Sequence, residues 1–144
     1  VILDPDHCWL IEIGDNVTIA PRVHILCHDA STKQYLGFTK IGNVKIGNNV
    51  FIGVESVIMP GVILGDNVII GANSTVTNSI PANSVAVGSP AKVICSTKEY
   101  INKERKRMEK APCYSENYTL RKDVSKELRS EMKKNIAGKI GYIE

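Results

Sequence analysis

The middle of the chain carries an aliphatic residue at every sixth position. Six successive hexads, which together cover residues 46–81, begin at Ile46, Ile52, Ile58, Leu64, Ile70 and Val76. The second place is glycine in four of the six hexads, and the fifth place holds only Val, Ser or Ile. A period of six fits neither the 3.6-residue repeat of a helix nor the alternation of a single strand. The pattern therefore indicates a longer turn of chain with the aliphatic side chains on its inner side.

A coil of three short strands joined by tight corners explains this period. Each coil then takes about 18 residues, and it buries its apolar face only against the coils above and below it. Glycine and asparagine in the hexads suit corners that require positive φ. A β-sandwich with Asn-Gly turns would not keep a fixed phase through six hexads. We therefore predict an all-β fold, a parallel β-helix in which the first-place side chains stack along the axis.

The same phase is visible upstream, with an interruption. Hexads begin at Ile13, Ile19 and Ile25, but the third has Asp29 in its fifth place. Because Ile13 and Ile46 are 33 residues apart, which is not a multiple of six, a segment has been inserted between them. We expect a loop over residues 30–40 to protrude from the coil, with His28 at its root. Loops held on rigid scaffolds often carry function.

Composition changes after residue 95. Residues 1–96 hold five basic and seven acidic side chains, whereas residues 97–144 hold thirteen and eight. We expect a β-helix domain over 1–95 and a C-terminal helical tail over 96–144, with helices over 97–110 and from 123 to about 135. The chain begins at Val1, inside what already looks like a coil, so we expect a further N-terminal portion to precede it.

Charge and cysteine usage narrow the function classes. Basic and acidic residues are interleaved in the tail, which is typical of a solvated helical face, and no nucleic-acid-binding motif accompanies them. No apolar run has the length of a membrane span. The four cysteines are widely spaced, without the clustering of a zinc site or a disulfide framework, which favours reduced thiols in the cytoplasm.

These motifs resemble a known family. The sequence resembles the hexapeptide-repeat acyltransferases in four segments. These are the Ile-Gly-Asp-Asn-Val run at 13–17, the His-Asp pair at 28–29, the hexads of 46–81 and the Val-Gly-Ser-Pro-Ala-Lys-Val-Ile run at 87–94. The similarity is to the maltose and galactoside O-acetyltransferase branch, nearest to enzymes that acetylate bacterial surface polysaccharides. It implies a left-handed helix, a homotrimer with active sites between subunits, acetyl-CoA as acyl donor, and a sugar or glycan acceptor. The tail after residue 97 resembles nothing we can place.

Acetyl transfer from a thioester to a hydroxyl needs a general base. Of the three histidines, His7 lies in an early turn and His24 belongs by its phase to a coil wall. His28 stands where the phase breaks, at the position of the family's catalytic histidine, so we expect it to be the base. Asp29 is a second catalytic candidate, and an equally good interpretation is that it closes the loop turn through an Asx-type hydrogen bond.

The resemblance also implies a cofactor site. It places the backbone N–H of Val54, after Gly53, against the thioester oxyanion, and it places coenzyme A along Gly53, Val54, Ala72, Thr77, Asn78 and Lys92. Asn78 and Cys95 stand where relatives usually have basic residues, so the phosphate contacts are expected to differ here. We assign Asp4 and Asp6 as candidate substrate-binding residues. We expect no metal, and we expect Cys27 to be dispensable because it alternates to the opposite side of the strand from His28.

Two other functions fit the same fold. A γ-type carbonic anhydrase uses this helix with three histidines on zinc, but His24 and His28 are only four residues apart and His7 is in a turn. A non-catalytic trimeric scaffold would need no histidine at the root of the loop. The presence of His28 argues for the transferase.

Overall fold

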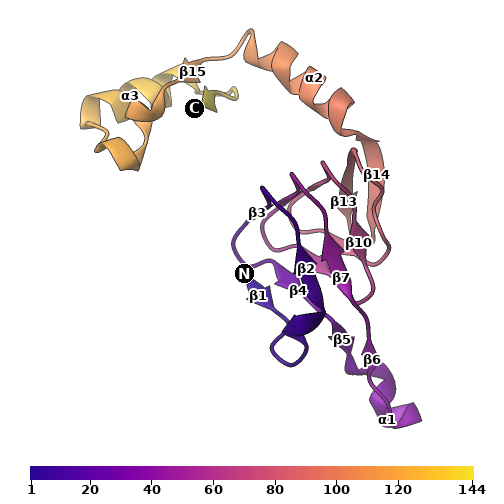
Figure 1. The fold of residues 1–144 in the computed structure, drawn as a ribbon. Coiled ribbons are helices and arrows are strands. Elements are labelled where there is room, and N and C mark those ends of the chain that lie inside the picture. The colour runs from indigo at the N-terminus through magenta and orange to yellow at the C-terminus, as the bar shows by residue number, and fades with distance from the viewer. The chain divides into compact units, whose positions relative to one another are not determined.

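The computed structural model describes residues 1–144, which form two compact units, Val1–Tyr100 and Ile101–Glu144 (Figure 1). In the first unit the chain contributes strands to three sheets in turn, and the strands of successive coils pair in parallel. One sheet contains β1 (Ile2–Leu3), β4 (His24–Ile25), β9 (Val57–Ile58) and β12 (Thr75–Val76). The second contains β2 (Ile11–Ile13), β7 (Val44–Ile46) and β10 (Ile63–Leu64). The third contains β3 (Thr18–Ile19), β8 (Phe51–Ile52), β11 (Ile69–Ile70), β13 (Ser84–Gly88) and β14 (Ala91–Ser96).

The register confirms the predicted coil length. Ile70 pairs with Ile52 and Val76 pairs with Ile58, and side chains stacked on successive coils are 18 residues apart. All six first-place side chains of the hexads are at most 1% exposed. The core of this unit is therefore the stack that the hexads predict.

The last hexad departs from this phase. Ile80, which the regular cut puts in a fifth place, forms a parallel bridge with Leu64 and so stands in the first-place stack. The corner between Val76 and Ile80 is two residues shorter than the others, and the Ser79 hydroxyl compensates by accepting a hydrogen bond from the Ile63 N–H. After this corner, β13 keeps the shortened spacing and pairs antiparallel with β14.

Two different requirements of the coil, positive φ at its corners and close stacking of its turns, are met at different places of the hexad. Positive φ falls in the fourth place of the hexad, at Asn49, Glu55 and Asn67, for example. The second-place glycines serve a different need, which is close stacking of one coil on the next. A Cβ on Gly53 would lie 2.4 Å from the backbone nitrogen of Ala72, so no side chain fits there.

The predicted insertion is a short hairpin. Its stem pairs β5 (His28–Asp29) antiparallel with β6 (Lys40–Ile41), and the 3-10 turn η2 (Ala30–Thr32) and the helix α1 (Lys33–Leu36) fill its tip. The Gly42 N–H donates to the Cys27 carbonyl and closes the stem against the coil. His28 is the first residue of the stem, as the sequence predicts.

The C-terminal tail consists mainly of helices and short turns. It contains α2 (Thr97–Met108), β15 (Cys113–Tyr114), the 3-10 turns η3 (Glu116–Tyr118) and η4 (Leu120–Lys122), α3 (Lys126–Asn135) and β16 (Tyr142–Ile143). Ser96 and Glu99 exchange hydrogen bonds at the start of α2 in a capping box. The second helix begins later than Asp123, because that residue is left-handed and Ser125 is the cap. None of the helices is long and apolar enough to cross a membrane.

Candidate active site

His28 is presented by the point at which the chain leaves the coil. Strand β4 ends at Ile25, and Cys27 is fully buried in the core. The next residue opens the hairpin, and its side chain is 27% exposed. This position holds the imidazole on a rigid coil while leaving part of it open to a ligand.

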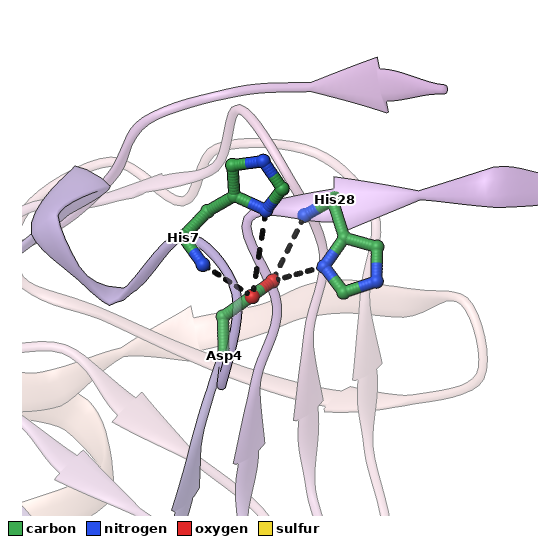
Figure 2. A group of neighbouring side chains, drawn as sticks. All are labelled: Asp4, His7 and His28. Carbon is green, nitrogen blue, oxygen red and sulfur yellow. Dashed lines mark hydrogen bonds and ion pairs between the residues drawn. The ribbon is translucent and has the colours of Figure 1, made fainter. Parts of the chain in front are cut away.

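The Asp4 carboxylate lies beside the His28 ring and points its oxygens toward both His28 and His7 (Figure 2). Asp4 follows β1, its carboxylate is fully buried, and Oδ2 lies 2.6 Å from Nδ1 of His28. Oδ1 accepts hydrogen bonds from the backbone N–H groups of Asp6 and His7. Oδ2 also accepts from those of Cys27 and His28. The sequence assigned Asp4 to substrate binding, whereas the structure makes it the partner of the candidate base. Asp6, the second residue of that assignment, is exposed in the turn.

The hydrogen bonds to Asp4 keep its carboxyl group ionised. Burial alone would raise the pKa of the Asp4 carboxyl, but the bonds from Cys27, His28, His7 and Asp6 outweigh it and hold the pKa well below its usual range. Because the carboxylate is ionised, Nδ1 of His28 carries the hydrogen and donates it to Oδ2. In the neutral ring, Nε2 then has a free lone pair, and this is the tautomer that a general base requires.

Asp29 does not share this role. Its carboxylate accepts from the Ser31 N–H at 2.9 Å and lies 2.6 Å from Nζ of Lys40. The Lys40 ammonium, together with the Ser31 hydrogen bonds, lowers the pKa of Asp29. The Asx-type turn, one of the two interpretations of the sequence, is confirmed. The orientation of His28 therefore depends on Asp4 and not on its chain neighbour.

His7 belongs to the same cluster, which sequence reasoning missed. Its ring lies 5.4 Å from the His28 ring, and its Nδ1 lies 3.8 Å from Oδ1 of Asp4, buried and without a hydrogen-bond partner. The hexad pattern treats this residue as part of a turn. Nothing in the local sequence shows that the turn folds back against His28, because the contact joins segments that are far apart in the chain.

Asp4, His7 and His28 are close enough to be considered as metal ligands, with their candidate atoms within 4.8 Å of one another. The donor set does not suit a metal ion. The two oxygens of Asp4 already accept four backbone N–H groups and the His28 ring, which uses the lone pairs that a cation would need. The geometry favours a hydrogen-bonded histidine–aspartate pair.

The corner before the first sheet holds two free backbone donors. The N–H groups of Val54 and Ala72 donate to no acceptor in the chain, although they lie one coil apart on the same corner. At another corner, by contrast, the backbone N–H groups of Asp15 and Asn48 each donate a hydrogen bond to a side-chain oxygen. Open, stacked N–H groups suit a ligand with carbonyl oxygens, which supports the assignment of Val54 and Ala72 to a cofactor site.

The candidate cofactor residues Thr77, Asn78 and Lys92 lie outside the corner that holds Val54 and Ala72. Thr77 lines a cavity of about 440 Å³ that Asp29, Lys40, Met59 and Gly61 also line. The Asn78 amide donates to the Thr77 hydroxyl, and both residues are exposed. Lys92 is exposed on β14.

The candidate residues next to the first sheet thus fall on two corners of the coil. Val54 and Ala72 precede strands of the first sheet, whereas His28 and Thr77 follow strands of the same sheet. They therefore lie at opposite ends of its strands. A single copy does not bring the candidate base and the candidate oxyanion donor to one point.

Two side chains near the site are structural. Cys27 is fully buried, and burial raises the pKa of its thiol, so it is a poor nucleophile. His24 lies within β4, paired with Ile2 on one side and Val57 on the other. The buried position of Cys27 and the place of His24 in a coil strand agree with the hexad phase.

Comparison with known proteins agrees with the repeat. Residues 43–78 match the family described as bacterial transferase hexapeptide (six repeats). This segment therefore carries the repeat of the hexapeptide family. The chain is 46% identical over 93 residues to the galactoside O-acetyltransferase of Escherichia coli K12, covering 60% of this chain and 44% of that protein. It is 41% identical over 99 residues to protein CapG of Staphylococcus aureus, covering 66% and 58%.

A solved structure gives the same result for the hexapeptide-repeat unit. A galactoside acetyltransferase in complex with coenzyme A is 40% identical, with a TM-score of 0.60, over 69% of this chain and 50% of that one. The chain spans about half the length of the relatives that it matches.

Proposed function

We propose that the protein is an acetyl-CoA-dependent O-acetyltransferase that acts on a hydroxyl of a sugar or polysaccharide precursor in the cytoplasm. The observation that carries this proposal is the pairing of His28 with the buried Asp4 on a hexapeptide-repeat coil. Galactoside acetyltransferase, which binds coenzyme A, has the same fold and supports the choice of cofactor. The proposal includes the left-handed winding implied by the family.

In this reaction His28 acts as the general base. Nε2 removes the proton of the acceptor hydroxyl as that oxygen attacks the thioester carbonyl of acetyl-CoA. Asp4 stabilises the imidazolium that forms, because its charge is fixed and its oxygens are already held by backbone N–H groups. The same imidazolium then returns the proton to the departing sulfur. No covalent acetyl-enzyme is required, in agreement with the buried state of Cys27.

The carbonyl oxygen becomes an oxyanion in the tetrahedral intermediate and needs a donor aimed at it. The free N–H of Val54 supplies this donor. The N–H of Ala72, one coil away, pairs with an amide carbonyl of the pantetheine arm. Neither group has a competing acceptor within the chain, so both are available to the cofactor without rearrangement.

The division of the site between two corners supports a homotrimer. In a ring of three copies, the corner that carries His28 in one subunit faces the corner that carries Val54 and Ala72 in the next. Each of the three sites then contains a complete set of groups. A non-catalytic scaffold remains the competing proposal, and it requires no ionised aspartate beside a histidine.

The direct test is thiol release from acetyl-CoA in the presence of a panel of oligosaccharides and nucleotide sugars. The wild type is expected to release coenzyme A only with an acceptor present. His28→Ala is expected to lose about 10²–10⁴-fold in kcat with little change in the KM for acetyl-CoA. Cys27→Ala should keep most of its activity. A trapped acetyl-enzyme, together with an inactive Cys27→Ala, would instead show a ping-pong mechanism.

A further inference from the structure

An exposed aromatic side chain is linked to the candidate base through one intervening ring. Trp9, the only tryptophan of the chain, is in the 3-10 turn η1 (Cys8–Leu10) and is 72% exposed. Its ring lies 5.4 Å from the His7 ring, which in turn lies 5.4 Å from the His28 ring. The three rings form a continuous row that ends at the base.

The turn that carries Trp9 is held rigidly. The Leu10 N–H donates to the His7 carbonyl, and the Leu10 side chain packs against the core of the coil. Leu10 therefore anchors the turn while Trp9 extends into solvent. A single exposed apolar side chain is ordinary on a protein surface. The position of this one, at the end of a row that begins at His28, is what requires an explanation.

Asp4 fixes the base and the aromatic turn to each other. Its Oδ1 accepts from the backbone N–H of His7, and its Oδ2 bonds the ring of His28. One buried carboxylate thus ties the base to the turn that carries the indole. Such a fixed link is what a site needs if it is to hold a substrate group within reach of a catalytic side chain.

We propose that Trp9, supported by His7, is the acceptor subsite: a pyranose ring stacks on the indole and presents a hydroxyl to Nε2 of His28. This inference rests on the proposed O-acetyl transfer. The face of an aromatic ring is electron-rich, and the C–H groups on one face of a sugar ring are weakly positive, so the two surfaces attract and exclude water. Acyclic acceptors such as serine present no such face, so the subsite selects cyclic sugars.

Kinetics with the panel sugar that gives the highest turnover test the subsite. Trp9→Ala is expected to raise the KM for that sugar about tenfold and leave the KM for acetyl-CoA unchanged, because only the stacking surface is lost. Trp9→Phe keeps an aromatic face and is expected to recover most of the affinity. An unchanged sugar KM in Trp9→Ala would overturn the proposal. So would an altered sedimentation coefficient, which would place Trp9 in a contact between copies.

Fluorescence gives a second readout that does not depend on turnover. Since the chain has one tryptophan, emission excited at the indole reports on Trp9 alone. Titrating His28→Ala with the same sugar is expected to change that emission saturably, because this variant keeps the platform and lacks only the base. Emission that does not respond would overturn the subsite. If the wild type turns over no sugar at all, the proposed function fails instead, before any Trp9 variant is measured.

Discussion

At the scale of single residues, Asp4 is the group on which the candidate site depends. The sequence shows an Asp-Pro-Asp turn but cannot show that the first carboxylate is buried beside a histidine 24 residues away. Asp4→Asn keeps the size of the side chain and removes its charge, so the imidazolium loses its counter-ion and the His28 tautomer is no longer fixed. We expect kcat to fall about 10²-fold or more, with a nearly unchanged KM for acetyl-CoA. Equal kcat values for the two proteins would contradict the pairing.

The same residue gives a prediction for stability. Because the pKa of Asp4 is lower in the folded chain than its ordinary value, its contribution to stability is present above that value and is lost as the pH falls below it. The free energy of unfolding of the wild type should therefore exceed that of Asp4→Asn most strongly above about pH 5, and the difference should shrink below about pH 4. Urea unfolding at several pH values measures this. A difference that grows on acidification would show that the carboxyl is protonated in the fold.

A substitution at Val54 can remove the proposed oxyanion donor without changing another side chain of the site. Proline already stands at Pro21, the equivalent place one coil earlier, where its carbonyl accepts from the Glu55 N–H. Val54→Pro should therefore fold, and it deletes an N–H that has no acceptor within the chain. We expect a loss of about 10²–10³-fold in kcat, whereas Val54→Ala, which keeps the N–H, should stay close to the wild type. Thermal unfolding of both variants checks that the coil is intact.

At the scale of elements, the hexads predict the coil because burial imposes their period. Ile58 is fully buried in β9, whereas Ile63, in the next strand, is 52% exposed. Ile58→Ala should cost about 2–5 kcal/mol of stability, since it opens a cavity in a stacked core. Ile63→Ala is the matched control, and we expect it to change stability by less than about 0.5 kcal/mol. Chemical denaturation compares the two, and equal losses would contradict the stacked core.

The hexad pattern does not predict every feature of the fold and of the candidate site. The shortened corner before Ile80 was missed, because an isoleucine suits the fifth place of a hexad as well as the first. The His7 and Asp4 contacts were missed because periodicity describes one face of the coil and says nothing of turns that fold back across it. The root of the hairpin at His28 was predictable, since the phase breaks at that residue.

At the scale of the whole molecule, the arrangement of corners underlies our proposal that the site is shared between copies. His28 and the free N–H of Val54 lie at opposite ends of the strands of the first sheet. Sedimentation of the wild type should therefore show a trimer, and dilution to the monomer should abolish acetyl transfer. Activity that persists in a monomer would require both groups to act within one copy.

Mixed assembly of two inactive variants tests this account most directly. His28→Ala lacks the base but keeps the Val54 donor, and Val54→Pro has the opposite defect. If each site takes its base from one copy and its donor from the next, trimers refolded from an equal mixture should recover about a quarter of the wild-type activity. The account predicts this recovery, well above the activity of either variant alone. A mixture no more active than the average of its two components would contradict a site shared between subunits.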